Sequence, residues 1–220
     1  AAAGEAGGAP PGPAFPVRTL YAPGHFGNSY EVAGEQEMRA LLAEALHWGF
    51  NRYADWFDTI DCSDPFAEKR LVNLGHALWA RKKASFRTAA RLGLACDLVL
   101  TPNHVFVDQL APDLAAVKSD RIFGQLLCPS KPNARQIILR NYEHLFGDLA
   151  RAGVRLAALA ACPYDYGGCA CKDCQPWILT FARLTRDIFA LAQKHHPGVQ
   201  MQMIGWWWSL DEHRQFAQWA

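Results

Sequence analysis

Segments with apolar residues at helical spacing alternate along this chain with short apolar runs. Between residues 35 and 48, one helical face collects Met38, Leu41, Leu42, Ala45 and Leu46. The same spacing predicts helices over about 65–92, 133–152 and 174–195, and one more that begins near residue 210. The short apolar runs predict strands at 17–21, 50–57, 94–100, 154–159 and 199–204.

A glycine separates each of the first four predicted helices from the strand that follows it. These residues are Gly49, Gly93, Gly153 and Gly198. Glycine is favoured at such positions because the residue after a helix often adopts a positive φ. Repeated strand–helix units predict a parallel sheet with right-handed crossovers. An open doubly wound sheet and a closed (β/α)8 barrel both fit this pattern.

The ends of the predicted strands favour the barrel. No Gly-x-Gly-x-x-Gly sequence or P-loop follows the first strand, which weakens the nucleotide-binding alternative. A (β/α)8 barrel usually needs about 250 residues, and the chain has 220. We therefore expect an α/β fold, an incomplete TIM barrel of about five and a half βα units in a fragment of a longer protein. Residues 1–16 are rich in Ala, Gly and Pro, which predicts a disordered lead-in before a domain at 17–220.

Charge and hydropathy exclude several kinds of partner. The net charge of +1 gives no indication of a nucleic-acid partner. The basic run 81–83 lies within a predicted helix and is expected to form a solvated face. No apolar run approaches the roughly 20 residues of a membrane span, so we expect no membrane partner.

Polar and aromatic residues gather where the predicted strands end. In a TIM barrel these ends meet at one rim, where the active site lies. The candidates are His25, Asn28, Asp55, Trp56, Asp58, His104, Tyr164, Asp165 and Trp206. Sugar rings stack on flat aromatic side chains, while Asn, His and carboxylate groups bond to hydroxyls. The rim therefore predicts a carbohydrate partner.

Two aspartates are the candidate catalytic groups. Asp165 lies between two tyrosines that would partly desolvate it and raise its pKa, as a general acid requires. Asp55 is the second candidate, as acid or stabilising carboxylate. The substrate ligands are predicted to be His25, Asn28, Trp56, Asp58, His104, Tyr164 and Trp206. The tryptophans at 206–208 cannot all face one side of a strand, so at least one of them is expected in the core.

The chain has seven cysteines, and disulfides cannot pair an odd number of them completely. Cys169, Cys171 and Cys174 form a C-x-C-x-x-C sequence, and Cys162 is a fourth candidate ligand. Four such thiolates would hold a structural zinc ion. Free thiols, or a disulfide between Cys162 and one of the three, are the alternatives. The remaining cysteines, Cys62, Cys96 and Cys128, are expected to have no site role.

Three segments carry a family resemblance. They are PGHFGNSY at 23–30, WGFNRYADWFD at 48–58 and DYGGCACKDCQPW at 165–177. Together they resemble a bacterial glycoside-hydrolase-like family related to the hexosaminidase and α-glucuronidase superfamily. The resemblance implies a TIM barrel that acts on sugar polymers or glycoconjugates. Hexosaminidases carry an adjacent Asp-Glu pair, whereas Tyr166 follows Asp165 here. In α-glucuronidase-type enzymes, the resemblance implies catalytic carboxylates on later strands, beyond Ala220.

The sequence thus predicts a glycoside hydrolase that works by carboxylate acid/base catalysis and needs no cofactor. Two alternatives remain. One is a carbohydrate-binding barrel without catalysis, and the other is a protein in which the cysteine cluster is a metal site.

Overall fold

The computed structural model describes residues 13–24, 28–68, 73–163 and 167–220. Most of the predicted lead-in lies outside these ranges, so its disorder stays a prediction. Within the described ranges, no helix combines the length and apolar character that crossing a membrane would require.

Five strands form one parallel sheet whose spatial order equals the chain order. They are β1 (Thr19–Tyr21), β2 (Arg52–Trp56), β3 (Ala95–Leu100), β4 (Leu156–Ala161) and β5 (Gln200–Met203). Each strand pairs in parallel with the next along the chain. Successive βα units of a TIM barrel are arranged in this way. The predicted α/β fold and its partial-barrel topology are therefore confirmed.

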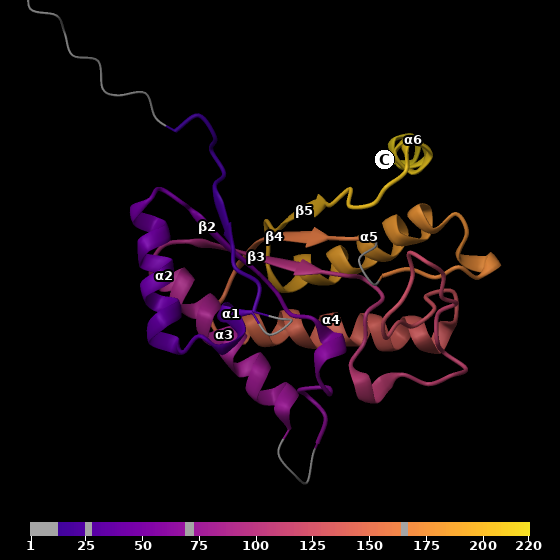
Figure 1. Cartoon of the computed structure of the whole chain (residues 1–220), viewed down its shortest axis with the longest axis horizontal. Coiled ribbons are helices and arrows are strands. Elements are labelled where there is room, and N and C mark those ends of the chain that lie inside the picture. The colour runs from indigo at the N-terminus through magenta and orange to yellow at the C-terminus, as the bar shows by residue number, and fades with distance from the viewer. Residues whose placement is uncertain (1–12, 25–27, 69–72, 164–166) are drawn as a thin grey trace, which may run out of the picture.

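Helices alternate with these strands (Figure 1). The long ones are α2 (Glu35–His47), α3 (Leu74–Arg91), α4 (Pro132–Arg151), α5 (Trp177–His195) and α6 (Leu210–Trp219), and a short α1 (Ser29–Val32) precedes them. Helix α3 begins later than predicted, because the Asn73 side chain caps it by accepting a bond from the His76 N–H at 3.2 Å. The four residues of α1 are too few to produce a helical pattern in the sequence.

The two faces of the sheet carry different cores. One face, which we call the helix-covered face, packs against the apolar sides of α2 to α5, and Leu98 and Leu159 lie in this large core. The other, the inner face, carries a small cluster of Ala54, Trp56, Val99 and Ala160. An ion pair at 3.2 Å between the partly buried Arg52 and the buried Asp97 joins β2 to β3. Burial raises the pKa of Asp97, and Arg52 opposes that shift.

The glycines between helices and strands have the backbone conformation that the sequence predicts. Their φ angles are 85° at Gly49, 87° at Gly93, 79° at Gly153 and 84° at Gly198. A Cβ added at any of them would meet no atom within 4 Å. Glycine is therefore required there for its positive φ and not for space.

Two connections extend from the C-terminal edge of the sheet. We call residues 101–131 the β3–α4 excursion and residues 162–176 the β4–α5 loop. Asn103 links them, because its Nδ2 donates to the carbonyls of Leu127 at 3.0 Å and Gly168 at 2.8 Å. A Cβ on Gly168 would lie 2.6 Å from Cγ1 of Ile122. The two segments therefore approach more closely than a side chain at that position would allow.

Candidate functional site

A buried acid–imidazole pair lies just beyond the ends of β2 and β3. Nδ1 of His104 lies 2.9 Å from Oδ1 of Asp58, and both side chains are almost fully buried. The imidazole stacks on the ring of Trp56, with centroids 6.2 Å apart and planes 27° apart. Because Trp56 belongs to the inner-face cluster, this pair is at the rim where a TIM barrel places its chemistry.

The Asp58 carboxylate is held from several sides. Its Oδ1 also accepts a hydrogen bond from the N–H of Ile60 at 3.3 Å. Burial and, second to it, the charge of Asp58 raise the pKa of Tyr142, whose hydroxyl donates to the carbonyl of Thr101 at 2.9 Å. A carboxylate so enclosed can fix the orientation of the His104 ring.

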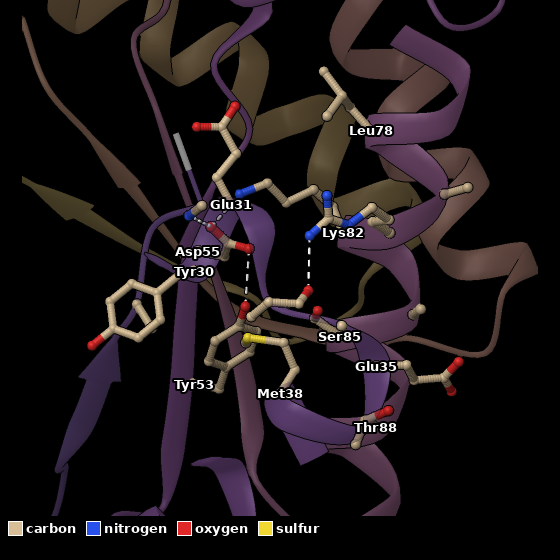
Figure 2. A pocket seen from close by; sticks show the side chains of 17 residues that line it. Tyr30, Glu31, Glu35, Met38, Tyr53, Asp55, Leu78, Lys82, Ser85 and Thr88 are labelled. Carbon is tan, nitrogen blue, oxygen red and sulfur yellow. Dashed lines mark hydrogen bonds and ion pairs between the residues drawn. The ribbon is translucent and has the colours of Figure 1, made fainter. Parts of the chain in front are cut away.

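Asp55 points the other way, toward α3 (Figure 2). Its Oδ1 is 2.6 Å from Nζ of Lys82 and also accepts bonds from the N–H groups of Gly24 and Trp56. Its Oδ2 accepts a bond from the Tyr53 hydroxyl at 2.9 Å. Burial first, and then Asp55, raise the pKa of Tyr53. The catalytic role predicted for Asp55 therefore has no support in this arrangement.

Lys82 corrects the prediction that the basic run 81–83 is a solvated face. Its side chain is only 11% exposed, and its Nζ also donates to the carbonyl of Trp56 at 2.9 Å. The prediction that Lys82 lies on a solvated face is wrong, because its amine contacts Asp55 and Trp56 and so joins α3 to the end of β2. The ion pair borders a pocket of about 300 Å³ between the β1–α2 connection and α3, shown in Figure 2. This pocket lies on the helix-covered side of β2, whereas Trp56 and His104 lie on the inner side.

Several predicted ligands are placed less favourably or lie outside the described residues. Asn28 caps α1: its Oδ1 accepts bonds from the N–H groups of Tyr30 and Glu31, and its Nδ2 donates to the carbonyl of Pro23 at 2.5 Å. Its amide is thus already engaged, which leaves the predicted hydroxyl-binding role without support. Three other predicted site residues lie outside the described ranges: His25, Tyr164 and Asp165. Their roles stay predictions.

The three consecutive tryptophans separate as expected. Trp208 is partly buried and packs against Phe181 of the large core and against Phe216. Trp206 is 52% exposed and Trp207 46%, and their rings stack with centroids 6.4 Å apart and planes 18° apart. This exposed pair follows β5, so it lies beyond the same edge of the sheet as the Asp58–His104 pair.

Four cysteine side chains form a cluster, which we call the thiol cluster. The sulfurs of Cys128, Cys169, Cys171 and Cys174 all lie within 4.8 Å of one another, and all four residues are free thiols. The predicted fourth member, Cys162, is not in the group that the described residues form. Cys128 takes its place because the end of the β3–α4 excursion folds back onto the β4–α5 loop.

Hydrogen bonds converge on the thiol cluster. The Val117 N–H donates to Sγ of Cys169 at 3.4 Å, and Oγ of Ser130 lies 2.8 Å from Sγ of Cys174. The contact with Cys174 lowers the pKa of Cys169, while the same contact raises the pKa of Cys174. A group of this kind could hold a metal ion.

Comparison with known proteins yields structural neighbours only. No family model and no curated protein matches the sequence. A variant of GH5_18 from Streptomyces cattleya, solved with Manβ1-4GlcNAc, aligns with a TM-score of 0.53 and 13% identity over 90% of this chain. A hypothetical protein from Ruminiclostridium thermocellum aligns with a TM-score of 0.51 and 14% identity, and covers 84% of this chain. The exo-β-1,4-mannosidase Op5Man5 from an Opitutaceae bacterium has a TM-score of 0.50 and 11% identity over 84% of this chain.

At such low identity these likenesses show the fold and not the reaction. The chain spans 47% of the S. cattleya protein, 31% of the mannosidase and 97% of the R. thermocellum protein. Two of these neighbours, the S. cattleya protein and the mannosidase, are glycoside hydrolases with the TIM-barrel fold. None of the three is described as a hexosaminidase or an α-glucuronidase, so the narrower family resemblance stays a prediction.

Proposed function

We propose that this chain belongs to a glycoside hydrolase that acts on oligo- or polysaccharides at the C-terminal edge of the sheet. The observation that carries the proposal is the imidazole of His104, held between the Asp58 carboxylate and the Trp56 ring. A rim that combines a fixed polar pair with aromatic rings suits a sugar, which offers hydroxyls and an apolar face at once.

Each residue has a distinct part in the proposal. His104 and Asp58 are given the part of a positioning pair that fixes the rim beside Trp56, and the hydroxyl-binding role of His104 stays a prediction because its side chain is only 2% exposed. Trp206 and Trp207 form a second stacking surface further along the edge. Asp165 is the general acid, a role that rests on the sequence alone. Asp55 is left out because its carboxylate is engaged by Lys82. The proposed hydrolysis needs no cofactor, so the thiol cluster has a role outside the reaction.

A panel of chromogenic aryl glycosides tests this proposal. Turnover of at least one glycoside is expected, with kcat about 10²–10⁴-fold lower in Asp165→Asn, which loses the acid. The matched control is Asp113→Asn, an exposed aspartate on the β3–α4 excursion, which should keep the wild-type rate. If Asp165→Asn and Asp113→Asn hydrolyse the same glycoside equally fast, the general-acid assignment fails.

A carbohydrate-binding barrel without catalysis is the second candidate. The exposed Trp206–Trp207 pair favours it, because stacked surface tryptophans bind sugars without any acid. Calorimetric titration with oligosaccharides separates the two candidates. Binding that Trp206→Ala weakens, without hydrolysis of any aryl glycoside or oligosaccharide, would replace the hydrolase proposal with the binding one.

A further inference from the structure

The thiol cluster joins two segments that are distant in the sequence. Cys128 comes from the end of the β3–α4 excursion, and Cys169, Cys171 and Cys174 come from the β4–α5 loop. Cys128, Cys169 and Cys174 are buried and Cys171 is partly buried. Four sulfurs so close together, away from solvent, need a chemical explanation.

We propose that Cys128, Cys169, Cys171 and Cys174 bind one zinc ion in a closed structural site that fastens the excursion to the loop. Zinc in structural sites is tetrahedral and commonly takes four thiolates. With all four positions filled by the protein, no position is left for a water or a substrate. The site is therefore structural and not catalytic.

The sulfur separations match a four-thiolate zinc site. Zn–S bonds of about 2.3 Å place the corners of a tetrahedron about 3.8 Å apart. Cys128 Sγ lies 3.7 Å from the sulfurs of both Cys171 and Cys174, and no pair in the cluster exceeds 4.8 Å. A disulfide would bring two sulfurs to about 2.05 Å and leave the other two unexplained.

The groups around the sulfurs suit thiolate ligands. The Val117 N–H and the Ser130 hydroxyl both lie against sulfurs of the cluster. The side chain of Gln175 donates to the carbonyl of Cys169 at 2.8 Å, which fixes the backbone between the ligands. Such outer contacts orient metal ligands and stabilise their negative charge. Zinc binding would displace the remaining thiol protons into solvent, with no change in oxidation state.

The ion would strengthen a junction that hydrogen bonds and the packing of Ile122 against Gly168 already form. Asn103 already joins the excursion to the loop through Leu127 and Gly168, and the Ala170 N–H donates to the carbonyl of Val117 at 2.8 Å. A zinc ion would add four zinc–sulfur bonds to these contacts. The loop that begins at the end of β4 is then fixed relative to the rim of the sheet.

Metal analysis of the purified 220-residue chain tests the site. Purification under reducing conditions, followed by inductively coupled plasma mass spectrometry, should find about one zinc per chain. The decisive comparison is between Cys128→Ser and Cys162→Ser. We expect Cys128→Ser to lose the zinc and Cys162→Ser to keep it. Retention by Cys128→Ser together with loss by Cys162→Ser would overturn the proposed ligand set.

A cobalt titration keeps the test decisive if Cys128→Ser fails to fold. The metal-free, reduced wild-type chain should bind one Co²⁺, with a strong thiolate-to-cobalt charge-transfer band and the visible bands of tetrahedral cobalt. Zinc should then displace the cobalt and abolish these bands. Absence of zinc in the purified chain, together with a flat cobalt titration, would overturn the metal site and favour free thiols. Because no glycoside is involved, failure here leaves the proposed hydrolase function untouched.

Discussion

Acidification is expected to destabilise this fold through one buried histidine, His196. This residue follows α5 and is fully buried. Its ring lies edge-on to the ring of Phe146, with the two centroids 6.1 Å apart. Its Nδ1 accepts a hydrogen bond from the N–H of Leu156 at 3.4 Å, at the start of β4. Burial, and after it the nearby charges of His195 and Arg155, lower the pKa of His196 from 6.5 to about 4.

The sign and size of the effect follow from these two values. Between pH 4 and 6.5 the unfolded chain binds a proton at this imidazole that the folded chain does not, so the free energy of unfolding rises with pH. The contribution is complete above pH 6.5 and is lost as the pH falls toward 4. With about 1.36 kcal/mol for each pH unit between 4 and 6.5, the full contribution is about 3 kcal/mol. For a chain of this length, that corresponds to a fall of about 6–12 °C in Tm.

Urea unfolding at pH 7 and pH 4.5, followed by tryptophan fluorescence, measures the effect. His196→Gln removes the titrating group, so its free energy of unfolding should fall less between the two pH values than that of the wild type. His76→Gln, which removes an exposed histidine, is the control and should keep the wild-type pH dependence. The reasoning is refuted if His196→Gln loses as much stability on acidification as the wild type does.

Three further changes test other parts of the molecule. Lys82→Met should cost about 3–5 kcal/mol in urea unfolding, since it leaves the buried Asp55 charge without its partner, and Asp55→Asn added to it should recover part of that loss. Gly168→Ala should lower the stability by about 1–3 kcal/mol, through its φ of 123° and the clash with Ile122, and a change below 0.5 kcal/mol would contradict that packing. Trp206→Ala should weaken oligosaccharide binding by about 0.5–1.5 kcal/mol in calorimetry, while unchanged affinity would remove this ring from the site.

The regular elements were predictable because they depend on local patterns. Apolar spacing located the helices and strands, and glycines such as Gly153 marked the turns, since only their positive φ had to be accommodated. The start of α3 was predicted too early, because the first residue of this helix is set by the Asn73 cap and not by apolar spacing. The β3–α4 excursion was not predicted, because its irregular backbone is held by tertiary contacts such as those of Asn103.

Contacts between distant segments explain what the sequence did not reveal about the site. Cys128 lies far along the chain from Cys169, and no local spacing relates the two. Lys82 lies in a basic run that is typical of a solvated helix face. Only the packing of α3 against β2 brings its amine to Asp55. In both cases the residue type was visible in the sequence, while its partner came from another element.

The alternation of side chains along β2 explains why Asp55 and Asp58 lie on different sides of the sheet. This alternation could be read from the sequence. Successive side chains of a strand point to opposite faces, so Asp55 shares a face with Tyr53, and Trp56 shares one with Ala54. The sequence left open which face of β2 the helices cover, because one face carries Tyr53 and the other carries Trp56. The packing of Tyr53 against Phe86 of α3, with centroids 5.4 Å apart, settles it. Asp55 must then face α3, where a carboxylate needs a cation such as Lys82. The aspartate that reaches the inner rim from this segment is therefore Asp58, beyond the end of the strand, where it meets His104.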